Sequence, residues 1–142
     1  MSLRVVAILF LLLIAGTLGL LTWRTLREGW SVELTTIGRK SGLRRSVTIW
    51  FVRDGDRVWL QAGQGGKTDW YRNLLASPRV ELDFGGNERR RGEAFPVDDA
   101  AEVARIHARF VDKYWMTRVF RLFGREFGGG RVVRVELFSP DE

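Results

Sequence analysis

The sequence predicts an α+β protein in which about six mostly antiparallel strands form a small or half-open barrel with packed helices, preceded by one N-terminal transmembrane helix. Three observations support this fold class. The chain has no charged residue between Val5 and Trp23, and a helix needs about 20 apolar residues to cross a bilayer. Most of the remaining chain alternates as strands do, with two strong hairpin signals. Strand–helix–strand units are too few for a doubly wound parallel sheet.

The first segment, residues 1–30, is interpreted as a membrane anchor helix with a juxtamembrane region. Its apolar run ends in LLTWRTLREGW, without the small-residue cleavage site of a signal peptide. A cleaved signal peptide and a buried core helix stay open as alternatives. Arg24 and Arg27 follow the run and only Arg4 precedes it. This bias favours a single-pass protein of the cell membrane whose domain, residues 31–142, faces the cytoplasm.

Strand-like segments begin the domain. SVELTTI is followed by RRSVTIWFV, and Asp54-Gly55-Asp56 then gives a hairpin signal before the strand DRVWLQAG. After a glycine-rich loop, DWYRNLLASP predicts a short helix with Asp69 as its N-cap and Pro78 as its stop.

A second hairpin is predicted from RVELDF and ERRRGEAFPV around Gly85-Gly86-Asn87. The longest helical pattern, DAAEVARIHARFVDKYW, has capping-box spacing between Asp99 and Glu102. A second aromatic stretch, WMTRVFRLFGREF, and a closing strand, RVVRVELF, follow. The apolar positions expected on one face of the long helix are Val103, Ile106, Phe110 and Tyr114.

Composition excludes several kinds of site. There is no cysteine, and His107 is the single histidine, so thiolate and paired-imidazole metal sites are excluded. His107 is expected to be a helix-surface or packing residue, which removes the usual nucleophile–histidine pairs. The net charge of +6 comes mostly from arginines interleaved with acidic residues, which does not favour a nucleic-acid binder. We therefore expect no metal and no catalytic side chain, and any enzymatic reaction would be carried by a cofactor.

A basic turn, IGRKSGLRR, is the first candidate site. Gly38 and Gly42 allow tight backbone geometry, and backbone N–H groups in such turns form concavities that bind anions. Lys40, Ser41 and Arg45 could hold a phosphate there. A solvated basic turn and attraction to anionic lipid headgroups are the alternatives.

The segment AGQGGKTDWYRNLL is the second candidate site. Gly63, Gly65 and Gly66 leave backbone exposed to a flat heterocycle, and Trp70 and Tyr71 could wall off one side of it. An ordinary loop followed by a packed aromatic helix explains the same residues.

Together the two segments resemble the deazaflavin-dependent nitroreductase family, small split β-barrel (FMN-binding-like) proteins that bind coenzyme F420. The resemblance is carried by G-R-K-S-G-x-x-R and by W-Y-x-N-L with a following proline, and it runs from about Leu34 to Phe84. This chain departs from the pattern at Thr48, where many members have proline, and in a shorter loop before DWY. Some branches of the family bind lipid instead of the cofactor.

The resemblance implies that the basic turn grips the cofactor's phosphate and its lactyl-glutamyl tail, and that the following strand lies beside the ring. The glycine loop would line the ring and ribityl chain, and the next helix would close that side, with Asn73 fixing the loop or closing the site. The implied cofactor-binding residues are Arg39, Lys40, Ser41, Arg45, Ser46, Val47, Thr48, Ile49, Trp50, Ala62, Gly63, Gln64, Gly65, Gly66, Trp70, Tyr71 and Asn73.

The implied function is a membrane-tethered F420-dependent oxidoreductase that transfers a hydride from reduced deazaflavin to a lipophilic, electron-poor acceptor such as a quinone or nitro compound. A non-enzymatic barrel that binds lipid, fatty acid or cofactor, and an FMN-dependent oxidoreductase, are the alternatives. Membrane lipids are expected contacts. A homodimer is a further expectation, because related barrels often dimerise and Ala15 and Gly19 have small-xxx-small spacing. The aromatic residues that could line the acceptor's entry are Tyr114, Trp115, Phe120, Phe123 and Phe127.

Overall fold

The computed structural model describes residues 6, 8–10, 12–17, 29–114, 116–122 and 130–140. The chain divides into two units, Met1–Trp30 and Ser31–Glu142, which we describe separately.

The described residues of the first unit, apart from 29 and 30, are helical. Within the described part of the chain, no helix is both long enough and apolar enough to cross a bilayer. The rest of the predicted span from Val5 to Trp23, including Gly19 of the small-residue pair, lies outside the described residues. The membrane anchor therefore stays a prediction.

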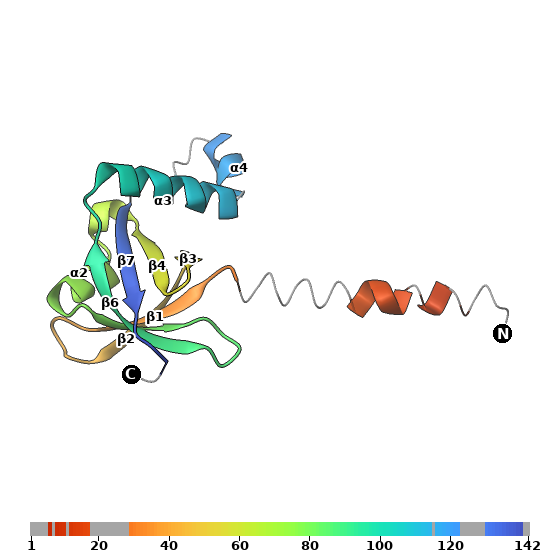
Figure 1. The fold of residues 1–142 in the computed structure, drawn as a ribbon, viewed down its shortest axis with the longest axis horizontal. Helices are drawn as coiled ribbons and strands as arrows, with labels where there is room; N and C mark the ends of the chain where they lie inside the picture. The colour runs from red at the N-terminus through yellow and green to blue at the C-terminus, as the bar shows by residue number, and fades with distance from the viewer. Residues whose placement is uncertain are drawn as a thin grey trace. The chain divides into compact units, whose positions relative to one another are not determined.

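The second unit is built on a seven-stranded sheet in the order β2-β1-β5-β6-β7-β4-β3, with antiparallel pairing throughout (Figure 1). The strands are β1 Val32–Ile37, β2 Arg44–Ile49, β3 Phe51–Asp54, β4 Arg57–Ala62, β5 Arg79–Asp83, β6 Arg89–Pro96 and β7 Arg131–Leu137. The helices are the 3₁₀ turn η1 Gln64–Gly66, α2 Asp69–Ala76, α3 Ala100–Lys113 and α4 Met116–Leu122.

The sheet curls because a single residue joins its two edges. The segment RRSVTIWFV, expected as one strand, breaks at Trp50 into β2 and β3, and these are the two edge strands. One residue between opposite edges forces the sheet to bend back on itself. The predicted half-open barrel is confirmed, and the break at Trp50 accounts for the additional strand.

Alternate residues of the strands fill the interior of the half-barrel. Leu34, Leu60, Leu82 and Val133 are fully buried and belong to one apolar cluster. They come from four different strands, as the two-residue period of a pleated sheet requires. Burial of each such side chain stabilises the fold by about 1.5–3 kcal/mol.

Both predicted hairpins are present. Asp54 pairs with Arg57 across the turn between β3 and β4, and Gly55 takes a φ of 58° there. This is the left-handed region, which glycine enters without a steric penalty. Asp83 pairs with Arg89 in the β5–β6 hairpin.

The long helix α3 crosses over one end of β4 and β7 (Figure 1). The Asp99 carboxylate caps it by accepting the Glu102 N–H at 2.7 Å, which confirms half of the predicted capping box. The Glu102 carboxylate does not reach back to the cap. It accepts the Trp59 Nε1–H at 3.0 Å and lies 3.2 Å from Arg134. The hydrogen bond from Trp59, with help from Arg134, lowers the pKa of Glu102. The predicted apolar face is confirmed: Ile106, Phe110 and Tyr114 are buried, and Val103 is half-buried.

Candidate functional site

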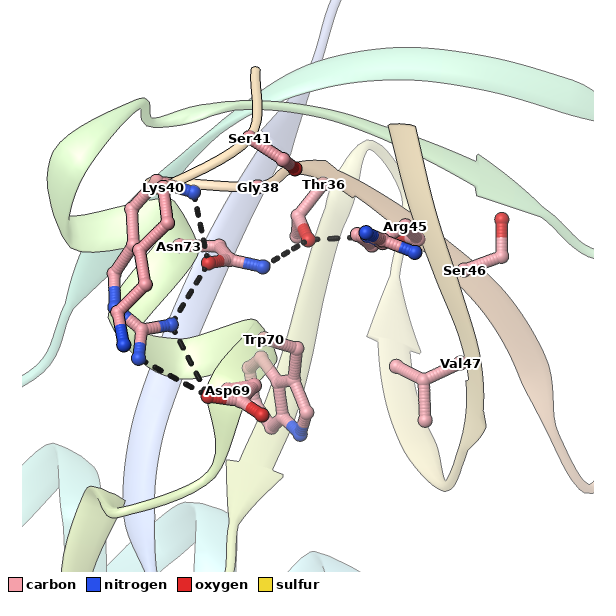
Figure 2. A pocket seen from close by; sticks show the side chains of 11 residues that line it. Thr36, Gly38, Lys40, Ser41, Arg45, Ser46, Val47, Asp69, Trp70 and Asn73 are labelled. Carbon is pink, nitrogen blue, oxygen red and sulfur yellow. Dashed lines mark hydrogen bonds and ion pairs between the residues drawn. The ribbon is translucent and has the colours of Figure 1, made fainter. Parts of the chain in front are cut away.

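A pocket of about 610 Å³ lies between the β1–β2 turn, the start of β2 and helix α2 (Figure 2). This volume is within the usual range for small-molecule sites. The residues that line it are Thr36, Gly38, Arg39, Lys40, Ser41, Arg45, Ser46, Val47, Asp69, Trp70 and Asn73.

The turn is closed by its own backbone. The Gly38 N–H donates to the Leu43 carbonyl at 2.8 Å, and the Gly42 N–H donates to the Gly38 carbonyl at 2.7 Å. Gly42 has a φ of 68°, and a Cβ on Gly38 would lie 2.7 Å from Ser41 Oγ. Gly42 is therefore favoured by its backbone conformation, and a side chain at position 38 would displace the Ser41 hydroxyl. Ser41 Oγ accepts the Leu43 N–H at 3.3 Å, which leaves the hydroxyl proton available to a ligand.

Asn73 holds this turn against α2. Its Oδ1 accepts the Arg39 backbone N–H at 3.1 Å and Arg39 Nη1 at 3.0 Å. Its Nδ2 donates to Thr36 Oγ1 at 3.3 Å, and that hydroxyl donates to the Arg45 carbonyl at 3.5 Å. Asn73 and Thr36 are both buried, so one amide fixes the turn and the strands on either side of it. Figure 2 shows this chain of contacts.

The start of α2 differs by one residue from the prediction. Thr68, with extended backbone, is the N-cap, and Asp69 is the first helical residue. The prediction that Asp69 is the N-cap is therefore wrong. Its carboxylate is bound to the Arg39 side chain. Both Nη1 and Nη2 of Arg39 lie 3.1 Å from Asp69 Oδ1. The helix ends at Ala76, because the residue before Pro78 is extended.

The cationic side chains of the pocket differ in whether a carboxylate neutralises them. The Arg39 guanidinium donates hydrogen bonds to the Asp69 carboxylate and to the Asn73 amide oxygen. Within the part of the chain that the structure describes, the Lys40 and Arg45 side chains have no carboxylate within ion-pair distance. The pocket therefore presents two cations that are not neutralised, together with a serine hydroxyl, which is a donor set suited to an anion.

The structure brings together part of the predicted cofactor-binding set. The members that line the pocket are Arg39, Lys40, Ser41, Arg45, Ser46, Val47, Trp70 and Asn73. Sequence reasoning missed Thr36 and Asp69. Thr36 looks like any strand residue in the sequence, because its partner Asn73 comes from a distant helix. Asp69 directly precedes Trp70 in the sequence, which could have placed it in the predicted site, but its position before the helix was interpreted as capping.

The other predicted contacts lie outside this pocket, so their role toward a cofactor stays a prediction. Ile49 and Tyr71 pack with the apolar core. The glycine loop folds onto Tyr71, since a Cβ on Gly66 would lie 2.9 Å from its Cε1. Trp50 stacks on Tyr114 with 4.6 Å between ring centroids. The full set outside the pocket is Thr48, Ile49, Trp50, Ala62, Gly63, Gln64, Gly65, Gly66 and Tyr71.

Tyr114, a candidate for the acceptor's entry, is buried and binds backbone. Its hydroxyl accepts the Phe51 N–H at 3.0 Å and donates to the Phe51 carbonyl at 2.8 Å. Burial raises the pKa of Tyr114 to about 12. Lys113 Nζ donates to the same carbonyl at 2.9 Å, and burial lowers the pKa of Lys113 to about 8. These two residues hold the corner between β2 and β3. The other entry candidates, Trp115, Phe123, Phe127 and the Phe120 side chain, lie outside the described residues.

His107 is half-buried on α3, and among the described residues no group of three or more His, Asp or Glu side chains is placed to hold a metal ion.

Residues 18–121 match the family of F420H2-dependent quinone reductases. Quinone reductases of this name from Mycobacterium tuberculosis, strains H37Rv and CDC 1551, are 38% identical to the chain over 58 residues. That segment covers 39% of this chain and 39% of each relative. The match thus spans well under half the length of the curated relatives.

Solved structures share the fold. An F420H2-dependent reductase (FDR-A) has a TM-score of 0.58 at 24% identity, covering 75% of this chain and 93% of its own. The heme storage protein HutZ of Vibrio cholerae has a TM-score of 0.59 at 14% identity, covering 83% and 88%. A domain-swapped dimer has a TM-score of 0.58 at 23% identity, covering 86% and 98%. The half-barrel is thus of the split-barrel type, and with its match over residues 18–121 the chain belongs to the F420H2-dependent quinone reductase family.

Proposed function

We propose that this protein is an F420-dependent oxidoreductase whose acceptor is a quinone. The observation that carries the proposal is a pocket in which Lys40 and Arg45, without carboxylate partners among the described residues, stand beside Trp70. Membership of the family and the activity by which the M. tuberculosis relatives are named support the same activity.

The residues present fit the anionic part of the cofactor. F420 carries a phosphodiester and tail carboxylates. Lys40 would meet this charge as an ammonium, Arg45 as a planar guanidinium, and Ser41 as a hydroxyl donor. When bound in its reduced form, the deazaflavin supplies a hydride to the acceptor. The chain's own contribution is to bind, orient and exclude water, so that no single side chain has to be catalytic.

The first experiment titrates the full chain with F420 and, separately, with FMN, and follows quenching of tryptophan emission. We expect micromolar or tighter binding of F420 and much weaker binding of FMN. Saturable binding of FMN alone would change the cofactor, and no response to either would overturn the proposal. Turnover is then measured as oxidation of reduced F420 by menadione under anaerobic conditions, with a nitro compound as the second acceptor.

The double variant Lys40→Ala with Arg45→Ala tests the anion site. It removes two charge-assisted contacts, each worth about 1.5–3 kcal/mol, so F420 affinity is expected to fall by well over tenfold. Arg57→Ala with Arg79→Ala is the matched control, since it removes the same charge from residues outside the pocket. Equal affinities of the two double variants would refute the assignment.

We also propose that the N-terminal segment tethers the protein to the membrane with the domain in the cytoplasm, and that the protein forms a homodimer. The uncharged run from Val5 to Trp23 supports the tether, which would place the domain near lipid-dissolved quinones. The domain-swapped neighbour motivates the dimer. Resistance of the full chain to carbonate extraction tests the membrane tether. Protease protection of intact cells tests the cytoplasmic orientation, and light scattering of the detergent-solubilised protein tests the homodimer.

A further inference from the structure

The basic turn and α2 are far apart in the sequence, yet each supplies one wall of the pocket (Figure 2). Lys40 and Arg45 come from the turn and the start of β2, and Trp70 comes from α2. Helix α2 is not part of the sheet, so the ladder hydrogen bonds between β1 and β2 do not set the distance between the two walls. A ligand that contacts both walls needs a fixed spacing, which side chains have to provide.

The Arg39 side chain joins the turn to α2. Its Nη1 and Nη2 both lie 3.1 Å from Asp69 Oδ1, and Nη1 also donates to Asn73 Oδ1 at 3.0 Å. Asp69 and Asn73 lie on the same side of α2, because residues four apart are neighbours on a helix surface. The planar guanidinium therefore binds two side chains of the helix that carries Trp70, a geometry that a lysine ammonium does not reproduce.

We propose that Arg39 is a positioning residue that sets the spacing between the basic turn and Trp70. Lys40 and Arg45 then supply the charges that the ligand's anion contacts. The inference rests on the proposed function and deepens it, because F420 carries a ring at one end and its negative charges at the other, and so needs both walls. This role differs from the one that the resemblance implies for Arg39, which is to grip the phosphate.

The contacts of Arg39 favour this role over direct contact with the ligand. Its side chain is 24% exposed, and its guanidinium makes three hydrogen bonds to side chains of α2. Turning towards a ligand would give up charge-assisted bonds to Asp69 and to the buried Asn73 amide. Lys40 and Arg45 have no such bonds to lose, since among the described residues neither side chain has a carboxylate within ion-pair distance.

The first test measures the spacing itself, without ligand. The chain has no cysteine, so spin labels can be attached through Leu43→Cys on the turn and Leu75→Cys on α2, at positions 59% and 55% exposed. Double electron–electron resonance then gives the distribution of distances between the labels in the full chain. In the double variant Arg39→Met with Asp69→Asn, we expect this distribution to broaden. An unchanged distribution would refute the positioning role.

The second test uses F420 and the same double variant without labels. The variant loses one positive and one negative charge, so the net charge of the pocket is unchanged. We expect F420 affinity to fall by about tenfold, because the walls are no longer preorganised. The salt dependence of the affinity should stay as in the wild type, because Lys40 and Arg45 still supply the attraction. A weaker salt dependence would show that Arg39 contacts the anion, and an unchanged affinity would show that the spacing does not matter to the ligand.

Two further variants make the outcome decisive. Arg118→Met with Asp112→Asn removes another exposed ion pair, outside the pocket, and should leave the distances, the affinity and its salt dependence unchanged. Arg39→Lys keeps the charge but loses the planar fork, so it should broaden the distances and weaken F420 binding as the double variant does. In both variants at position 39 the backbone N–H can still donate to Asn73 Oδ1, and urea denaturation checks that they fold. Wild-type distances and affinity in Arg39→Lys would refute the proposal.

The outcomes separate this inference from the proposed function. If the wild-type chain does not bind F420, the proposed function fails and the inference fails with it. If it binds F420 but the double variant keeps the wild-type distances or the wild-type affinity, only the role of Arg39 is refuted.

Discussion

At the scale of single residues, the site depends on one buried amide. Asn73 uses both ends of its side chain, accepting twice from Arg39 and donating to Thr36. A carboxylate could not supply the donor, and an alanine could supply neither. The uncharged residue of the motif therefore fixes Arg39 and the start of the basic turn.

Asn73→Ala is expected to lower the free energy of unfolding by about 2–3 kcal/mol, because it leaves the Thr36 hydroxyl and the Arg39 N–H without their partner. It should also weaken F420 binding, since the turn loses its attachment to α2. Urea denaturation measures the first effect. Leu75→Ala, on the same helix but 55% exposed, is the control and should stay within about 0.5 kcal/mol of the wild type. A similar stability for the two variants would contradict this account of the turn.

At the scale of elements, the end of α3 fastens the corner at which β2 passes into β3. Lys113 and Tyr114 both bind the carbonyl of Phe51, and Lys113 Nζ lies 3.7 Å from the centre of the Phe51 ring. A partly buried ammonium at this point makes the docking of the helix sensitive to protonation.

The pKa of Lys113 is about 8 in the folded chain, against 10.5 for an unperturbed lysine, because burial disfavours its charged form. Between these two values the unfolded state binds more protons than the folded state, so stability rises with pH. Relative to Lys113→Met, the wild type is expected to gain about 1–2 kcal/mol between about pH 8 and pH 10.5, less than the full shift would give, because solvent screens the half-buried ammonium. Denaturation curves of both proteins across that range measure the difference. A difference that stays flat would show that Lys113 is not desolvated by its contact with β3.

At the scale of elements, the sequence predicted those features that depend on residues close together in the chain. The Gly55 turn, the Asp99 cap and the apolar face of α3 each depend on neighbouring residues, and sequence reasoning found them. The break at Trp50 was missed because WFV continues an apolar run and carries no glycine or proline. Whether an unbroken run stays in one strand or bends between two sheet edges depends on distant partners, here Tyr114.

At the scale of the whole molecule, strand order and pocket were less accessible to sequence reasoning. β7 pairs with both β4 and β6, a placement between distant segments that no hairpin signal indicates. Lys40, Ser41 and Arg45 were predicted from their residue types and from glycines beside them. Asp69 and Thr36 enter the pocket only because α2 packs against β1, so their position depends on tertiary structure and left no periodic signal.

The closure of the half-barrel at Trp50 leads to a prediction for the molecule as a whole. Because Trp50 joins the two edge strands and stacks on Tyr114 at 4.6 Å, removing its ring should loosen both edges together. In Trp50→Ala we expect faster amide hydrogen exchange in β2 and in β3, although these strands lie at opposite ends of the sheet order. The β5–β6 hairpin, away from both edges, serves as the internal control and should exchange as in the wild type. Faster exchange in β3 alone would mean that the Trp50 ring only holds α3 in place, and that strand β2, which lines the pocket, is held independently by β1.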